Sequence, residues 1–228
     1  MPPGNIPNIR WLTAMDRSKG MHTKTRGPYA KTPARRATII AAAREAFIEH
    51  GYDNASLRDI AKRAGITHQG LLRHFRGKPE LLLKVLRQRD TTARARAGDL
   101  LAAGTSGAAT ASRILQDELR DPGMLQLWAT LQPAAARPDH PAHEYFLERQ
   151  RHWVALIAQE MRDRDLAGHL TPGLDATTAA TLLLAGLGGL QLQALLDPDL
   201  DVDHAVRSLY AALMSGAPPD HQGIGSAD

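Results

Sequence analysis

The stretch Ser56–Pro79, SLRDIAKRAGITHQGLLRHFRGKP, has the pattern of two short helices joined by a tight turn. Ser56 and Thr67 are suitable N-caps, because a hydroxyl at such a position accepts a hydrogen bond from an unpaired first-turn N–H. Between them, Gly65 stands where the chain must turn, often with a positive φ. The spacing therefore predicts a helix-turn-helix.

Each predicted helix has a buried side and an exposed side. In the first, apolar residues recur at one-turn spacing, at Leu57, Ile60, Ala61 and Ala64. In the second, Leu71 and Phe75 point back to the core. The outer side of the second helix is then left to His68, Gln69, Gly70, Arg73 and His74. A short helix with a basic, hydrogen-bonding outer side suits the DNA major groove, although any helical hairpin has a polar outer side.

The charge distribution along the chain favours a polyanionic partner for the first part. The net charge is +4, but residues 1–96 carry 20 Lys and Arg against 7 Asp and Glu, a net charge of +13. Residues 97–228 carry 8 against 17, a net charge of −9. RNA or an acidic membrane surface would explain this asymmetry equally well, and the helical hairpin is what favours duplex DNA.

From about Thr32 to Val85, and most closely in GYDNASLRDIAKRAGIT and LLRHFRGKPELL, the chain resembles the DNA-binding domain of TetR-family transcriptional regulators. The resemblance covers about a quarter of the chain. It implies an all-α protein, with an N-terminal three-helix helix-turn-helix domain and a C-terminal helical domain for ligand binding and dimerisation. It also implies DNA contacts at Ser56, Thr67, His68, Gln69, Gly70, Arg73, His74 and Lys78.

Within that set, Gln69 and Arg73 suit base edges, since they match the adenine and guanine patterns. Thr67, His74 and Lys78 suit phosphates, and Gly70 suits a close approach of the DNA backbone. One departure is Leu72, where the family commonly carries a tyrosine that touches a phosphate.

We expect four segments: a flexible basic tail at 1–31, the helix-turn-helix domain at 32–92, the second domain at 93–215 and a disordered tail at 216–228. Met15 and Met21 leave open whether the first 14–20 residues belong to the native start. Basic residues at the N-terminal end would either reach the DNA or only aid solubility; they are Lys24, Arg26, Lys31, Arg35 and Arg36.

The cellular compartment is suggested by what the sequence lacks. It contains no cysteine, which removes disulfides and thiolate metal sites and agrees with the cytoplasm. The N-terminus has no continuous apolar region of a signal peptide. Because no run reaches about 18 uninterrupted apolar residues, we expect no transmembrane helix and no membrane partner.

The segment Asp175–Leu196 is apolar on nearly every side, so it is either buried within one subunit or faces a second chain. Its Gly186, Gly188 and Gly189 each cost about 1 kcal/mol of helix propensity relative to alanine, which close helix approach or a ligand can return. The resemblance implies a homodimer formed by the last two long helices of each subunit. The segment LLLAGLGGLQLQALLDP also looks like the BetI-like subset of the family.

Four of the ten aromatic residues fall within a 26-residue section of the second domain: Trp128, Tyr145, Phe146 and Trp153. They would line a pocket for a flat or cationic molecule, and core packing explains them almost as well. Polar handles for such a ligand would be Gln126, His143 and Gln150.

The sequence thus predicts a DNA-binding transcriptional regulator, most often a repressor in this family. It would bind a palindromic operator as a homodimer and be released by a small-molecule effector. The alternatives are a ligand-independent or architectural DNA-binding protein, and a small helical enzyme. His140, His143, Glu144 and His152 do not reproduce a zinc motif, so we predict no metal site, no cofactor and no catalytic residue. The operator, the effector and the direction of regulation are not encoded in the chain.

Overall fold

The fold is all-α, as predicted. A computed structural model describes residues 31–163 and 166–214, and apart from an isolated β-bridge between Leu170 and Met214 their regular structure is helical. The helices are α1 (Lys31–Asn54), α2 (Leu57–Arg63), α3 (His68–His74), α4 (Lys78–Ala102), α5 (Gly107–Leu119), α6 (Pro122–Ala134), α7 (His143–Asp163), the 3-10 helix η2 (Leu166–His169), α8 (Ala176–Leu196) and α9 (Val202–Leu213). The two predicted tails lie outside the described residues, apart from Lys31.

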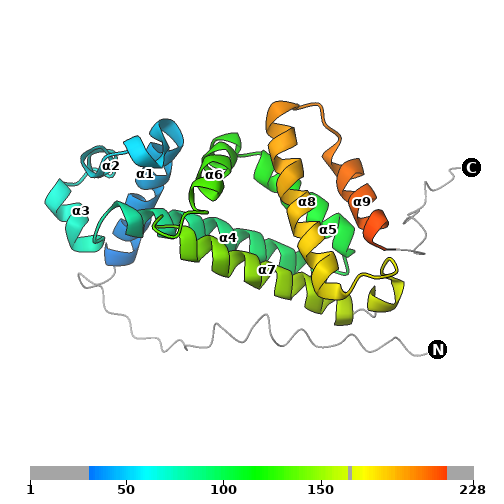
Figure 1. Cartoon of the computed structure of the whole chain (residues 1–228). Coiled ribbons are helices and arrows are strands. Elements are labelled where there is room, and N and C mark those ends of the chain that lie inside the picture. Colours follow the sequence, from blue (N-terminus) through cyan, green and yellow to red (C-terminus); the bar gives the residue numbers. More distant parts are fainter. Residues whose placement is uncertain (1–30, 164–165, 215–228) are drawn as a thin grey trace, which may run out of the picture.

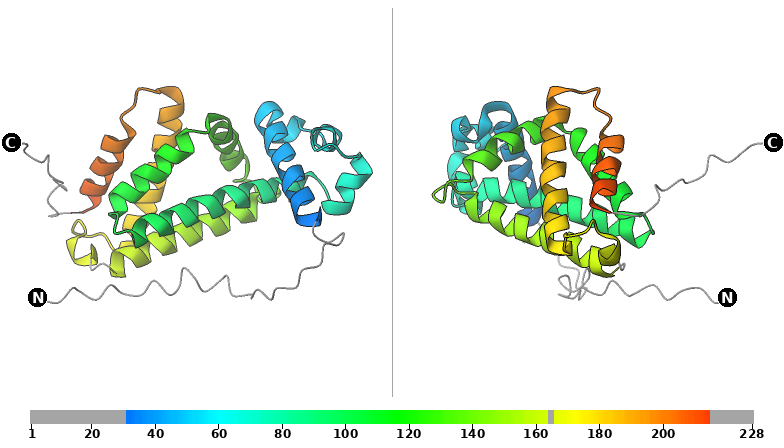
Figure 2. Two further views of the ribbon diagram at one scale, coloured as in Figure 1. Left: turned by 180° about the vertical axis from the view of Figure 1, so that it is seen from behind. Right: turned by 45° about the vertical axis from the view of Figure 1, so that its right-hand side comes forward.

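Helices α1, α2 and α3 form one end of the molecule, and α5, α8 and α9 form the other (Figure 1). The long helices α4 and α7 run side by side between the two ends, as the views in Figures 1 and 2 both show. Helix α6 packs against both α1 and α8. The boundary expected between residues 92 and 93 falls inside α4, so this continuous helix belongs to both parts of the molecule.

The helix-turn-helix forms with the predicted caps and turn. Ser56 Oγ accepts a hydrogen bond from the Asp59 N–H at 3.1 Å, and Thr67 Oγ1 accepts one from the Gly70 N–H at 3.0 Å. Gly65 has φ 65°, the left-handed conformation that favours glycine. The side chains predicted to face the core are buried at Ile60, Ala61, Ala64, Leu71 and Phe75.

Replacing Gly65 with alanine is expected to lower the free energy of unfolding by about 1–2 kcal/mol, because an L-residue is strained at positive φ. Nothing lies within 4 Å of a Cβ added there, so the cost comes from the backbone alone. Gly77→Ala is the matched control, since Gly77 has an extended φ of 163° and its added Cβ would meet only Pro79 Cδ, at 3.7 Å. Chemical denaturation of both variants measures the difference, and equal costs would contradict the strain argument.

Helix α1 contacts the N-terminal end of α6. Arg44 of α1 forms an ion pair with Asp121, the residue that caps α6. Next to it, a Cβ added at Gly123 would lie 2.6 Å from Ile48 Cγ2, so α1 and α6 approach closely there. Helices α1 and α6 are therefore in direct contact at this point.

Helix α8 is the most exposed apolar element of the described chain. Leu182 is 45% exposed, Leu192 50% and Leu196 88%. By length and composition alone α8 meets the criterion for a helix that could cross a membrane, with only 17% of its apolar window buried. A core helix of a soluble protein passes the same test, so the expectation of no transmembrane helix stays a prediction. The sequence of α8 contains no uninterrupted apolar run of that length, because threonine, glycine and glutamine lie among its apolar residues.

Candidate nucleic-acid interface and internal pocket

Most of the predicted DNA contacts lie on α3 and its N-cap. Gln69 and Arg73 are exposed on this helix, His68 and His74 are half-buried, and Thr67 is exposed at the cap. Ser56 is exposed at the start of α2. The structure therefore presents amide, imidazole and guanidinium groups on one short helix.

Lys78, a predicted phosphate contact, uses two of its three N–H donors within the protein. Its Nζ donates to the carbonyl oxygens of Tyr52 and Asp53, both at 2.8 Å, and lies 4.7 Å from the centre of the Tyr52 ring. These contacts fix the start of α4 to the segment before α2. The sequence could not reveal this role, because the acceptors lie more than 20 residues earlier in the chain.

Arg36, one of the basic residues expected near the DNA, makes several contacts within the protein. Its guanidinium group lies 4.1 Å from the centre of the Phe75 ring, donates to the His74 carbonyl oxygen and pairs with Glu80 at 3.5 Å. Arg36 therefore holds the end of α3 against α1 and α4.

Two further positions on α3 have local explanations. A Cβ added at Gly70 would lie 3.2 Å from Thr67 Oγ1, so the cap itself favours glycine there, independently of any DNA backbone. Leu72 is 43% exposed and has no hydroxyl to donate to a phosphate.

An internal pocket of about 1000 Å³ lies in the second part of the molecule, lined by residues of α4 to α9. Five of the predicted ligand residues line it: Trp128, His143, Phe146, Gln150 and Trp153. Gln126 does not line it and is exposed on α6. Tyr145 does not line it either, because its ring is buried behind the wall between Trp128 and Phe146.

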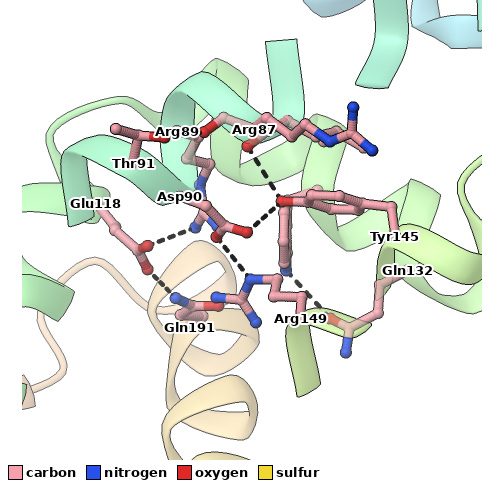
Figure 3. Close-up of polar contacts among 11 residues, drawn as sticks. Arg87, Arg89, Asp90, Thr91, Glu118, Gln132, Tyr145, Arg149 and Gln191 are labelled. Atoms are coloured by element: carbon pink, nitrogen blue, oxygen red, sulfur yellow. Dashed lines mark hydrogen bonds and ion pairs between the residues drawn. The ribbon is translucent and has the colours of Figure 1, made fainter. Parts of the chain in front are cut away.

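The buried hydroxyl of Tyr145 instead belongs to a polar network between α4 and α7 (Figure 3). It donates to Asp90 Oδ2 at 2.6 Å and to the Leu86 carbonyl oxygen at 3.1 Å. Arg149 Nε donates to Asp90 Oδ1 at 2.8 Å. Burial and the nearby Asp90 carboxylate raise the pKa of Tyr145, which keeps its hydroxyl protonated as a donor.

A second ion pair extends the network to α5 and α8. Arg89 pairs with Glu118 at 2.8 Å, and Glu118 also accepts a hydrogen bond from Gln191 (Figure 3). Burial raises the pKa of Glu118 and lowers the pKa of Arg89, although each partner opposes the shift of the other. Four helices thus meet through charges that are largely withdrawn from water.

Two guanidinium groups already lie over the Trp128 ring, so this ring does not support the expectation of a cationic ligand. The Arg89 guanidinium carbon lies 4.1 Å from the ring centre and that of Arg149 lies 4.6 Å from it. A cationic ligand approaching this aromatic side chain would be repelled by both arginines.

Sequence reasoning missed the network of Arg89, Asp90, Glu118, Arg149 and Gln191. One signal was present: Leu82, Leu86 and Asp90 are spaced four residues apart, so a carboxylate continues the buried stripe of α4. An acidic residue on a buried stripe indicates a paired charge.

The histidines considered as metal ligands take other roles. His140 Nδ1 accepts a hydrogen bond from the Ala142 N–H at 3.2 Å, and His143 Nδ1 lies 2.9 Å from the Ala135 carbonyl oxygen. Within residues 31–163 and 166–214, no group of three or more His, Cys, Asp or Glu side chains is arranged to hold a metal ion.

Residues 39–85 match the family described as bacterial regulatory proteins, tetR family. The transcriptional activator FasR of Mycolicibacterium smegmatis is 40% identical over 63 residues, which are 28% of this chain and 29% of FasR. The transcriptional regulator SrpR of Pseudomonas putida is 42% identical over 60 residues, which are 26% of this chain and 28% of SrpR. The matches to these curated relatives thus span less than a third of their length.

Solved structures extend the likeness of fold to most of the chain. NalD, the secondary repressor of the MexAB-OprM multidrug efflux pump in Pseudomonas aeruginosa, has a TM-score of 0.65 at 23% identity, with 82% of this chain and 100% of NalD covered. SmeT, the repressor of the Stenotrophomonas maltophilia efflux pump SmeDEF, has a TM-score of 0.62 at 23% identity, with 83% of this chain and 96% of SmeT covered.

These relatives are described as transcription regulators, not as enzymes. The match at residues 39–85 identifies the DNA-binding domain. The likeness to solved structures shows that the helices beyond this domain share the same fold. Residues 39–85 therefore belong to the tetR family of bacterial regulatory proteins, and the rest of the chain shares the fold of these solved structures.

Proposed function

We propose that the protein is a transcriptional repressor that binds a palindromic operator as a homodimer in the cytoplasm and is released by a small-molecule effector. The single observation that carries this proposal is the exposed face of α3, where Gln69 and Arg73 are free to reach base edges. The excess positive charge of residues 1–96 supports it, because phosphate neutralisation supplies much of the affinity for DNA. The repressor assignment follows NalD and SmeT, which are described as repressors.

The exposed face of α8 supports the homodimer. Leu182, Gly189 and Leu196 recur every seven residues, and Leu192 lies on the same side of the helix. Nothing in the described chain lies within 4 Å of a Cβ added at Gly189, so packing within one subunit does not explain that glycine. A helix from a second subunit would cover this stripe and place two copies of α3 on one DNA duplex.

The position of the pocket supports control by an effector. Helix α4 lines the pocket from Thr91 to Leu101 and begins at Lys78, beside the end of α3. A molecule that favours one position of α4 would change the separation of the two recognition helices in the dimer. Its effect on DNA binding equals its differential affinity for the two states, typically about 1–3 kcal/mol.

Selection of bound duplexes from a random DNA library, at controlled salt, tests the proposed function. We expect a palindrome whose half-sites are about 34–36 Å apart, or a multiple of that spacing. Arg73→Ala is expected to relax specificity at one base pair of each half-site by about 1–3 kcal/mol and to leave helicity unchanged. Arg113→Ala, at an exposed position of α5, is the matched control and should select the wild-type sequence. Binding without any sequence preference would favour an architectural protein and contradict the proposal.

A further inference from the structure

The guanidinium group of Arg149, which lines the pocket, has N–H donors without acceptors. Arg149 uses Nε to bind Asp90, and its two terminal nitrogens point away from that carboxylate (Figure 3). Neither terminal nitrogen has a hydrogen-bond partner among the residues that the structure describes. The Arg149 side chain is 17% exposed, and this residue lines the pocket.

The polar end of the pocket also carries more positive than negative charge. Arg94 lines it one turn after Asp90 and has no ion pair within the described ranges. The carboxylates of Asp90 and Glu118 are each already paired with an arginine. Of the charged side chains that line this end of the pocket, Arg94 and Arg149 therefore stand against Glu118, whose carboxylate is paired with Arg89.

The remaining titratable groups that line the pocket do not cancel this excess. Burial and the nearby charge of Arg94 lower the pKa of His152, which favours its neutral form, while Asp90 opposes the shift. His143 lies against a backbone carbonyl oxygen. Glu160 lies 11 residues beyond Arg149 on α7, about 16 Å along the helix, and so at a different level of the pocket.

A second donor, one turn further along α7, lacks an acceptor. The indole N–H of Trp153, one turn after Arg149 on α7, is buried and has no hydrogen-bond partner in the described part of the chain. Buried donors normally have partners, so this end of the pocket is short of acceptor atoms.

We propose that the effector is an amphipathic carboxylate whose head is bound by the terminal nitrogens of Arg149. This inference rests on the effector pocket of the proposed function. A carboxylate supplies the missing acceptors and matches the planar fork of a guanidinium group. Its apolar body lies further along the pocket, where the lining is aliphatic at Leu101, Ile114, Ile157, Leu184 and Leu187.

Binding of the head also gives the effector a connection to α4. Arg149 is the residue through which α7 holds the Asp90 carboxylate of α4. A carboxylate ligand on the terminal nitrogens shares this guanidinium group with Asp90, which uses Nε, and so connects the ligand to α4 through one side chain. The ligand therefore acts on the helix that leads to α3.

The test compares three probes with the same ten-carbon chain: decanoate, decanol and decylammonium. Binding to the full-length protein is followed by calorimetry and by tryptophan fluorescence, since Trp128 and Trp153 line the pocket. We expect decanoate to bind about tenfold or more tighter than either of the other two, because hydrogen bonds to charged groups are the stronger ones. Arg149→Gln should reduce decanoate binding to the level of decanol, whereas Arg151→Gln, at an exposed position outside the pocket lining, should leave it unchanged.

Decanol or decylammonium binding as tightly as decanoate, or no binding of any probe, would overturn the inference. If Arg149→Gln does not fold, the double variant Asp90→Asn with Arg149→Gln replaces it, because this variant removes both charges of the pair together. The order of affinities of the three probes for the wild-type protein tests the inference in either case. The proposed function is judged separately by DNA selection on the same protein. If the protein selects a palindrome but does not prefer decanoate, the proposed regulator function stands and the carboxylate effector is rejected. If it prefers decanoate but binds DNA without sequence specificity, the carboxylate site stands and the proposed regulator function is rejected.

Discussion

Asp90→Ala is expected to lower the free energy of unfolding by about 3–5 kcal/mol, because it leaves a largely buried guanidinium group without its carboxylate. Asp90 is 4% exposed and accepts hydrogen bonds from both Tyr145 and Arg149. After the substitution the positive charge of Arg149 remains close to Arg89, whose pKa is lowered by burial and, to a smaller extent, by Arg149. Repulsion between the two arginines is then less compensated.

Thermal and chemical denaturation measure this effect. For a chain of this size the expected loss corresponds to a fall in Tm of about 6–20 °C. Asp99→Ala removes a carboxylate from an exposed position on the same helix and should change stability by no more than about 0.5 kcal/mol. The pair Asp90 and Arg149 should also couple: Asp90→Ala with Arg149→Met should cost less than the two single changes added together. Additive costs would show that the ion pair contributes little.

The local parts of this fold follow from the sequence. The caps at Ser56 and Thr67 and the turn at Gly65 depend on residues within one or two turns of each other, and the structure confirms them. The structure likewise ends α8 at Leu196, the last residue of the apolar segment Asp175–Leu196 identified in the sequence. These features depend on backbone chemistry that short windows of sequence contain.

The roles of the charged side chains could not be predicted from the sequence, because they depend on which helices pack together. Lys78 is predicted to contact a phosphate, but its sequence position does not reveal that Nζ also donates to the carbonyl oxygens of Tyr52 and Asp53. Tyr145 suggested a pocket wall, but its hydroxyl reaches Asp90, 55 residues earlier in the chain. Sequence spacing places a side chain on a face of a helix, and only the packing of α4 against α7 shows what that face meets.

Leu192→Asp is expected to convert the proposed homodimer into monomers and to weaken operator binding by about a hundredfold or more, because the two half-site contacts no longer reinforce each other. Leu192 is 50% exposed in a single subunit, so an aspartate there can be solvated in the monomer and leaves the subunit fold intact. In the proposed dimer, the carboxylate of each subunit would be buried in the contact between the α8 helices without a partner.

Sedimentation equilibrium and a binding titration with the selected operator measure the two effects together. Gln126→Asp is the matched control, since it adds the same charge at an exposed position on α6, away from the α8 stripe, and should remain dimeric. A monomeric wild-type protein, or a Leu192→Asp variant that stays dimeric with full affinity, would show that α8 is not the dimer contact. The exposed leucines at Leu182 and Leu196 would then need another partner, because an apolar stripe of this length is costly to leave in water.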